Sequence, residues 1–177
     1  MKIRIILTMM EIILTGTLFA DIEIFKFDED PGFEAPFKSK WVPNGINSQK
    51  NCSIVPGGKN GNALLIDGQK SYGEVYSCVP LLINPEKDRV KLSIFAKGFG
   101  SFEILLFCYG KSYLGSVMLI KGICKEDGWN EFKTEFRFDK NKFKRFDDLE
   151  STRIAINVNK GGKIMFDDLV CERISGE

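Results

Sequence analysis

The chain of 177 residues contains no histidine. This absence removes the Ser-His and Cys-His nucleophile systems, the commonest general base of enzymes and the commonest zinc ligand. The five cysteines include no C-x-x-C pair, which argues against a zinc site built on cysteine as well. The sequence therefore offers few groups for catalysis or for zinc binding.

Neither sign of charge is in excess, because 25 lysines and arginines accompany 24 aspartates and glutamates. Residues 1–20 carry Lys2, Arg4 and Glu11, so the rest of the chain holds equal numbers of basic and acidic residues. The single basic run, "KNKFKRF" at 140–146, is interpreted as a solvated loop. Nucleic-acid binding depends on neutralising phosphates, so this balance predicts no nucleic-acid partner.

Long apolar runs are missing outside the N-terminus, so no other segment approaches the ~20 residues of a membrane span. Residues 1–20 combine early positive charge, a mostly apolar run and Ala20 at a plausible cleavage site, a pattern typical of a signal peptide. We therefore expect a secreted, periplasmic or cell-surface protein whose single domain spans 21–177. Glu11 interrupts the apolar run, so a later start or a first β-strand is the alternative.

The five cysteines leave two interpretations open. Export would permit one or two disulfides with at least one thiol left over, in a pairing that the spacing does not determine. Alternatively, several of the cysteines act as buried small apolar residues. They are Cys52, Cys78, Cys108, Cys124 and Cys171.

Apolar and polar residues alternate with a period of two through almost the whole chain, between turns that contain Gly or Pro, such as "GFG" at 98–100. Helical spacing is limited to one short candidate at 145–151. Many short strands with such turns are typical of an antiparallel sandwich or barrel, and the length suits one domain. We therefore predict an all-β fold, an antiparallel two-sheet β-sandwich. The expected strands are 61–67, 73–79, 89–97, 101–110, 130–139, 152–159 and 161–174.

Three of these strands combine an apolar face with a mixed second face. In the strand at 101–110 one face is wholly apolar, and the other carries Glu103, Phe107 and Tyr109. Side chains on alternate positions of a strand point to opposite sides of a sheet, so these three groups share one side. The same mixture recurs at Glu74 and Tyr76 of 73–79, and at Arg153 and Asn157 of 152–159.

If the three strands lie in one sheet, their mixed faces form a floor of aromatic rings, carboxylates, an arginine and an amide. Pyranose rings stack on aromatic planes, and their hydroxyls need partners such as Asn, Glu and Arg, so this composition indicates a sugar-binding face. An ordinary sheet face with a few exposed rings is the alternative. The expected stacking platforms are Tyr76, Phe107 and Tyr109, and the groups expected to bind hydroxyls are Glu74, Glu103, Arg153 and Asn157.

The order of several weak motifs adds a resemblance to a known family. The motifs are "FKFDEDPG" at 25–32, Trp41, "GGKNGNALLI" at 57–66, "DRVKLSIFAKG" at 88–98, "GWNEFKTEFRF" at 128–138, "RIAINV" at 153–158 and "KIMFDDLVCERI" at 163–174. In this order they resemble the carbohydrate-binding modules of the galactose-binding-like jelly-roll type, over most of residues 22–174. The resemblance implies a jelly roll with its first and last strands near each other. It also implies a monomeric, non-catalytic module that binds a polysaccharide or oligosaccharide.

Paired aspartates, Asp167 and Asp168, occupy a part of the last expected strand where Asp is disfavoured. In the modules that the chain resembles, carboxylates of the first and last strands and groups near a Gly-rich turn hold a structural calcium ion. The resemblance therefore implies calcium, which accepts such an irregular oxygen set. Alternatively, the two aspartates pair with a basic side chain or cap a turn. The implied ligands are Asp28, Asp30, Asp167, Asp168 and carbonyls at 59–62.

Two other functions remain open from the sequence. A two-carboxylate glycosidase would use Glu74 and Glu103, on adjacent strands, as acid and nucleophile. A structural or protein-adhesion sandwich would need no sugar site at all. Release of reducing ends from a polysaccharide would indicate the first function, and binding to proteins without a glycan response would indicate the second.

Overall fold

The computed structural model describes residues 32–37, 40–125 and 128–175. The expected signal peptide, the expected first strand and the expected calcium ligands Asp28 and Asp30 lie outside the described residues. None of the helices within these ranges has the length and apolar content that a bilayer crossing requires.

Strands dominate the described chain, with one short α-helix and one 3₁₀ turn. In chain order the elements are β1 (Trp41–Pro43), α1 (Gly45–Asn51), β2 (Cys52–Gly58), β3 (Gly61–Asp67), β4 (Gly73–Ser77), β5 (Leu81–Leu82), β6 (Asp88–Tyr109), β7 (Tyr113–Cys124), β8 (Asn130–Arg137), η1 (Phe146–Asp148), β9 (Ser151–Val158) and β10 (Lys163–Ser175).

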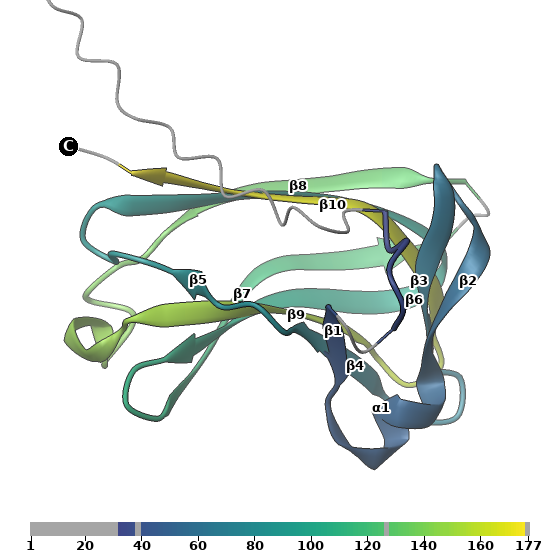
Figure 1. Cartoon of the computed structure of the whole chain (residues 1–177), viewed down its shortest axis with the longest axis horizontal. Helices are drawn as coiled ribbons and strands as arrows, with labels where there is room; N and C mark the ends of the chain where they lie inside the picture. Colours follow the sequence, from purple (N-terminus) through teal and green to yellow (C-terminus); the bar gives the residue numbers. More distant parts are fainter. Residues whose placement is uncertain (1–31, 38–39, 126–127, 176–177) are drawn as a thin grey trace, which may run out of the picture.

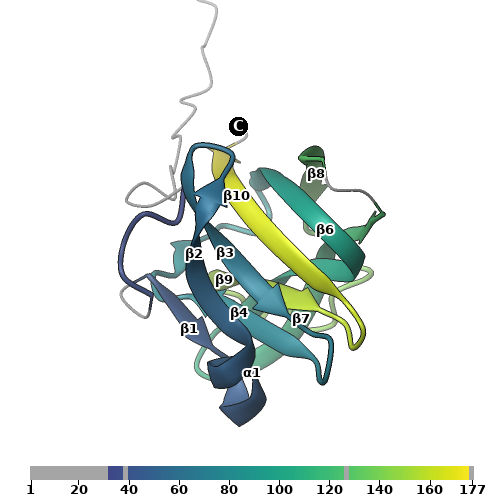
Figure 2. The same cartoon turned by 90° about the vertical axis from the view of Figure 1, so that its right-hand side faces the viewer.

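The strands form two antiparallel layers, which Figures 1 and 2 show from two sides. One layer, the β10 sheet, has the order β2-β3-β10-β6-β8. The other layer, the β9 sheet, has the order β1-β4-β9-β6-β7, with β5 beside β9. The predicted all-β sandwich of two antiparallel sheets is therefore confirmed.

Strand β6 belongs to both sheets and connects them. It pairs with β10 and β8 up to Phe99, and with β7 and β9 from Gly100 onward. The predicted turn at "GFG" is therefore wrong. Gly98 and Gly100 have φ angles of +133° and +107°, and a Cβ on Gly98 would lie 2.2 Å from the carbonyl oxygen of Lys163. The glycines thus bend one continuous strand tightly against β10 instead of reversing the chain.

The core lies between the two sheets and is rich in phenylalanine. Phe102 is fully buried, and its ring meets those of Phe132 and Phe166 edge to face, with centroids 4.9 and 5.2 Å away. Gly122 of β7 lies against the same ring, because a Cβ at this position would be 2.2 Å from its Cζ atom. The apolar faces of β4, β6 and β9 all contribute to this core, so their mixed faces are the ones that point outward.

Four thiols belong to this packed interior. Cys52, Cys108, Cys124 and Cys171 are buried and free, which favours the interpretation of these cysteines as small apolar residues over disulfides. Burial raises the pKa of Cys52, Cys108 and Cys171 to about 12. These thiols are therefore neutral in the folded protein at physiological pH.

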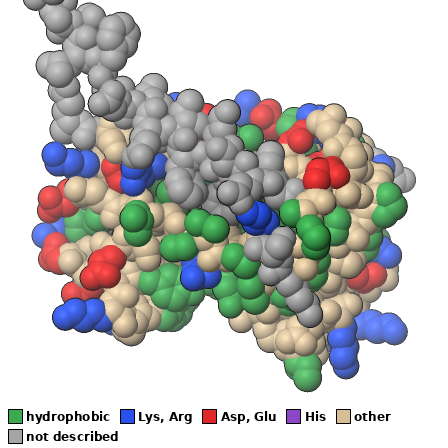
Figure 3. Space-filling view, in the orientation of Figure 1, with side chains coloured by type: hydrophobic (Ala, Val, Ile, Leu, Met, Phe, Trp, Pro, Cys, Tyr) green, Lys and Arg blue, Asp and Glu red, His purple; other side chains and the backbone are tan. Residues whose placement is uncertain are grey.

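Charges of both signs are interspersed on the surface that Figure 3 presents. Two residues of the basic run at 140–146 form ion pairs with the aspartates that follow it. Lys140 pairs with Asp147 at 2.8 Å, and Arg145 pairs with Asp148 at 3.0 Å. Both aspartates belong to η1, a single 3₁₀ turn within the short helical candidate at 145–151.

Candidate functional site

The three strands with a mixed face are neighbours in the β9 sheet. Strand β9 pairs with β4 on one side and with the C-terminal half of β6 on the other. In this register Glu74 and Glu103 flank Asn157, while Phe107 lies beside Arg153. The prediction that these strands share one sheet is confirmed. We call the solvent-side surface of β4, β9 and β6 the outer face.

Aromatic rings on the outer face form a chain of contacts. Tyr76 and Phe107 have ring centroids 6.2 Å apart, and Phe107 and Tyr113 have centroids 5.9 Å apart. Tyr113 in turn meets Tyr109 at 5.5 Å. All three distances lie in the range of about 4.5–7 Å that is typical of interacting rings. The structure therefore brings together all three predicted stacking residues.

Tyr113 was not predicted as part of this site. It opens β7, is 52% exposed and lies directly opposite Tyr109 in the β6–β7 hairpin. The sequence "YGKSY" contains the signal that could have identified it, because a tight hairpin over these residues places the two tyrosines in register.

Arg153 lies among the rings. Its guanidinium carbon is 5.8 Å from the ring centroid of Tyr76 and 6.0 Å from that of Tyr109. One guanidinium nitrogen, Nη1, donates a hydrogen bond of 3.1 Å to the carbonyl oxygen of Ser77. Burial raises the pKa of Tyr109, and the positive charge of Arg153 acts in the opposite direction. The arginine is thus held in place by two rings and one backbone carbonyl.

Glu74 is a buried acceptor, only 4% exposed, at the other end of the outer face. Its carboxylate accepts hydrogen bonds from the side-chain amide of Asn44 and from the hydroxyl of Tyr72. Burial and this hydrogen bond raise the pKa of Tyr72. Neither Asn44 nor Tyr72 was predicted, because both lie between strands and reach the site only through the tertiary fold.

Asn157 lies between the two carboxylates and is 6% exposed. Its carbonyl oxygen, Oδ1, is buried and has no hydrogen-bond partner among the described residues. A buried acceptor without a partner costs about 1–3 kcal/mol. Glu103 on the next strand is 4.0 Å from the Lys121 ammonium of β7. This end of the outer face is therefore rich in acceptors.

A hollow of about 410 Å³ opens at the arginine end of the outer face. Its volume falls within the range of roughly 300–1,000 Å³ that small-molecule sites occupy. The hollow is lined by Tyr76, Pro80, Tyr109, Ser151 and Arg153.

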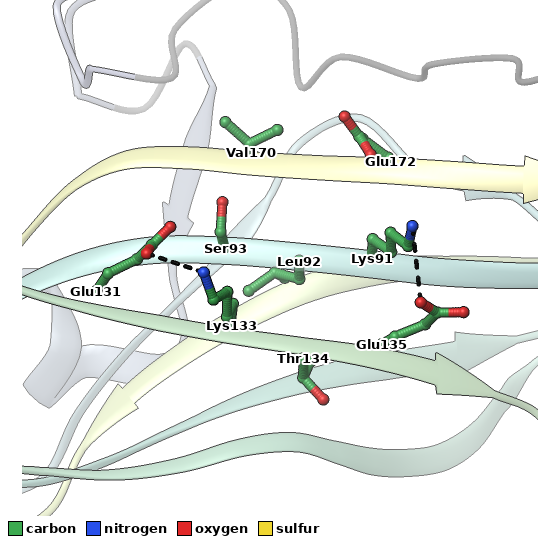
Figure 4. A pocket seen from close by; sticks show the side chains of 9 residues that line it. All are labelled: Lys91, Leu92, Ser93, Glu131, Lys133, Thr134, Glu135, Val170 and Glu172. Atoms are coloured by element: carbon green, nitrogen blue, oxygen red, sulfur yellow. Dashed lines mark hydrogen bonds and ion pairs between the residues drawn. The ribbon is translucent and has the colours of Figure 1, made fainter.

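A second hollow, of about 460 Å³, lies on the β10 sheet over β10, β6 and β8 and is drawn in Figure 4. None of the described residues that line it is aromatic. Its lysines already have partners, since Lys133 pairs with Glu131 at 3.2 Å and Lys91 pairs with Glu135 at 3.7 Å. The outer face is therefore the better candidate site, because it carries a chain of interacting aromatic rings.

Asp167 and Asp168 lie at a β-bulge of β10, where the pairing with β6 shifts register. The Asp167 side chain is fully buried, and its Oδ2 accepts hydrogen bonds from the backbone N–H groups of Lys59 and Asn60 at 2.6 and 3.1 Å. Burial raises the pKa of this carboxyl, whereas the backbone hydrogen bonds lower it. Asp168 pairs with the Lys59 ammonium at 3.1 Å. Both aspartates therefore fix the β2–β3 turn, as the alternative interpretation expected.

Three oxygen atoms near this turn lie around Gly32. A Cβ built on Gly32 would lie 3.6 Å from both Asp167 Oδ1 and Glu34 Oε1, and 3.8 Å from the carbonyl oxygen of Asn60. Calcium takes about six to eight oxygens, so these three could be part of such a site. Glu34 was not predicted, whereas the carbonyl of Asn60 lies in the predicted stretch 59–62. Within the described ranges, three or more His, Cys, Asp or Glu side chains do not gather into a metal site.

The sequence matches no known protein family and no curated protein. Its fold is shared with solved structures. The CBM22-1 and GH10 modules of endo-1,4-β-D-xylanase 10B from Clostridium thermocellum, complexed with xylohexaose, align with a TM-score of 0.61 and 15% identity, over 87% of this chain and 29% of that longer chain. The CBM22-1 xylan-binding domain of Xyn10C from Paenibacillus barcinonensis aligns with a TM-score of 0.61 and 8% identity, over 87% of this chain and 97% of that domain.

The same fold also occurs in an enzyme. A cyclase from Fischerella sp. TAU, in complex with 4-(1H-indol-3-yl)butan-2-one, aligns with a TM-score of 0.57 and 12% identity, over 84% of this chain and 96% of the cyclase. At identities this low, the structural similarity shows a shared fold and nothing further. The predicted fold, the jelly roll of carbohydrate-binding modules, is thereby confirmed.

Proposed function

We propose that this protein is a non-catalytic carbohydrate-binding module that holds a polysaccharide or oligosaccharide on the outer face. The observation that carries the proposal is the chain of four partly exposed rings, Tyr76, Phe107, Tyr109 and Tyr113, on one sheet face beside the hollow that Arg153 lines. Exposed aromatic rings are surfaces on which the C–H faces of pyranose rings stack. The guanidinium of Arg153 adds hydrogen-bond donors for sugar hydroxyls.

Both parts of the outer face suit sugars. The C–H face of a pyranose can stack on Tyr76, Phe107 or Tyr109, and its hydroxyls can donate to Glu103. The solved neighbours that bind xylan or hold xylohexaose support a polysaccharide ligand for this fold.

The carboxylates favour binding over catalysis. Glu74 accepts hydrogen bonds from Asn44 and Tyr72, so it is positioned as an acceptor and is buried from solvent. Asn157 separates Glu74 from Glu103 in the register of the sheet. Because a cyclase has the same fold, a catalytic activity of this chain must be tested by experiment.

As a second part of the proposal, the oxygen atoms of Asp167, Glu34 and Asn60 near Gly32 support a structural calcium ion. Asp167, Glu34 and the carbonyl of Asn60 would hold it, and the predicted ligands Asp28 and Asp30 would complete the set. The ion would supply positive charge to a buried carboxylate and tie the β2–β3 turn to β10. Export through the segment 1–20, to the outside of the cell where polysaccharides occur, is consistent with this function.

Isothermal titration of the purified chain against soluble glucans, mannans, xylans and galactans tests the proposal. We expect dissociation constants between micromolar and millimolar, roughly −8 to −4 kcal/mol, because a shallow face leaves much of the sugar hydrated. Release of reducing ends from the same panel would contradict the non-catalytic assignment. Absence of binding to every glycan would replace the proposal with a structural or adhesion function.

A further inference from the structure

Arg153 has no acidic partner among the described residues, whereas Lys121 on the neighbouring strand β7 has one. Its guanidinium nitrogens have no carboxylate oxygen within 4.0 Å in the part of the chain that the structure describes, whereas Lys121 is 4.0 Å from Glu103. Arg153 contacts the carbonyl of Ser77 and the rings of Tyr76 and Tyr109. These contacts fix the guanidinium without neutralising its charge.

The carboxylates of the outer face lie at its other end. Glu74 and Glu103 are in register with Asn157, four residues beyond Arg153 on β9. Four residues of a strand span about 13 Å, which exceeds the Debye length of about 8 Å at physiological ionic strength. The outer face thus has an acceptor end and a separate cationic end.

The hollow at the cationic end has room for a ligand group. Of the five described residues that line it, Arg153 is the only charged one, and the two tyrosines, Pro80 and Ser151 complete the lining. A guanidinium offers five N–H donors, of which Ser77 accepts one. The donors that remain are well matched by a carboxylate, because planar guanidinium and carboxylate groups pair through two parallel hydrogen bonds.

We propose that this hollow selects a uronosyl residue, so that the glycan recognised by the outer face carries carboxylate groups. The inference rests on the proposed glycan-binding function and specifies its substrate class. Arg153 pairs with the uronosyl carboxylate, Tyr76 or Tyr109 stacks on the sugar ring, and Glu74 and Glu103 disfavour a second carboxylate at the other end. The separation of the two ends therefore also gives the bound chain a direction.

Matched ligands test this inference without any mutation. We would titrate the purified chain with oligogalacturonates and glucuronoxylan oligosaccharides, and with the same compounds after chemical reduction of their carboxyl groups. The acidic form of at least one pair should bind about tenfold more tightly than its reduced form, because charge-assisted hydrogen bonds are lost on reduction. This preference should shrink as salt is added, since the hollow is open to solvent.

Variants then assign the preference to Arg153. Arg153→Gln should abolish the difference between acidic and reduced ligands, and Arg153→Lys should keep only part of it, because an ammonium lacks the planar fork. Arg89→Gln is the matched control, since Arg89 lies on the β10 sheet and pairs with Glu135 at 2.9 Å. This control should retain the full preference.

Each adverse result has a separate meaning. Equal binding of acidic and reduced ligands, with affinity still dependent on the tyrosines, would overturn the uronate inference and leave the glycan-binding function intact. An unchanged preference in a folded Arg153→Gln variant would overturn the assignment to Arg153. Equally tight binding of a sulfated oligosaccharide would overturn the selection for carboxylates. If neither acidic nor neutral glycans bind, both the inference and the proposed function fail.

Discussion

The carboxylate of Asp167 accepts a 2.6 Å hydrogen bond from the backbone N–H of Lys59, a residue 108 positions earlier in the chain. A second hydrogen bond, from the N–H of Asn60, reaches the same oxygen. The other oxygen accepts from the N–H of Asp168 at 2.7 Å, inside the bulge of β10. One side chain therefore fixes both the bulge and the β2–β3 turn, which explains an aspartate in the middle of a strand.

Replacement of Asp167 by Asn should lower the free energy of unfolding by about 1–3 kcal/mol. An amide has one acceptor oxygen, whereas the N–H groups of Lys59, Asn60 and Asp168 approach both oxygens of the carboxylate. Either orientation of the amide therefore places an N–H donor against another N–H. Urea denaturation followed by circular dichroism measures the change.

Asp168→Asn is the matched control for this substitution. Asp168 has φ of +48°, which Asn adopts readily, and its ion pair with Lys59 is partly exposed. The loss should stay within about 1 kcal/mol, as for other partly exposed pairs. A larger loss for Asp168→Asn than for Asp167→Asn would contradict the role given to the buried carboxylate.

Calcium should raise the melting temperature of metal-stripped protein. An ion that binds only the folded state adds about 2.7 kcal/mol of stability at a hundredfold excess over its dissociation constant. Burial raises the pKa of Asp167, so a proton competes with the ion and the effect of calcium should weaken toward acidic pH. Differential scanning calorimetry with and without chelator measures this shift.

Glu34→Gln tests the calcium site and Glu135→Gln is its control, because the first change removes a charge beside Gly32 and keeps the shape of the side chain. It should reduce the calcium-dependent shift more than Glu135→Gln on the far edge of the β10 sheet. Identical melting curves for stripped protein with calcium and with chelator would rule the site out.

The faces of the strands could be predicted from the sequence, because alternation alone separates core from solvent. Strand β7 escaped prediction for two physical reasons. Gly115 and Gly122 make the segment look less like a strand, because glycine is disfavoured in strands. In the structure, a side chain larger than glycine at 122 would collide with the ring of Phe102. The pairing with β6 also shifts between Ile104 and Leu105, which interrupts the alternation around Leu119.

The candidate site was predictable only where strands supply it. Strands β4, β6 and β9 carry the seven predicted residues, and their pairing brings these residues onto one face. Asn44, Tyr72 and Tyr113 come from connections or a hairpin end, whose approach to the sheet depends on tertiary packing. Local sequence carries little information about such approaches.

Stability should fall as pH rises from about 9 to 12. Burial raises the pKa of Cys52, Cys108 and Cys171 from 9.0 to about 12, so unfolded thiols lose protons in this range while folded thiols keep them. Their contribution to stability is complete below pH 9 and is lost as pH approaches 12. Each thiol adds a slope of about 1.4 kcal/mol per pH unit. Urea denaturation across this pH range measures the slope.

Cys108→Ala separates this effect from other alkaline titrations. The variant should show a shallower fall of stability above pH 9, even though it starts from a lower stability because a buried side chain has been shortened. In the native wild type at pH 8, the buried thiols should resist a thiol reagent until denaturant is added. Rapid labelling of the buried thiols in native protein would contradict the packed core.

Tyr76→Ala and Tyr109→Ala should each weaken glycan binding about fivefold, because a stacked ring contributes roughly 1 kcal/mol beyond its buried area. Tyr76→Phe and Tyr109→Phe keep the ring and should bind nearly as the wild type does. Val170→Ala, an exposed apolar change on the β10 sheet, is the control for nonspecific effects. Isothermal titration with the best ligand of the panel measures all five variants, and circular dichroism verifies that each is folded. If both alanine variants bind as tightly as the wild type, the glycan does not stack on the outer face and the site lies elsewhere.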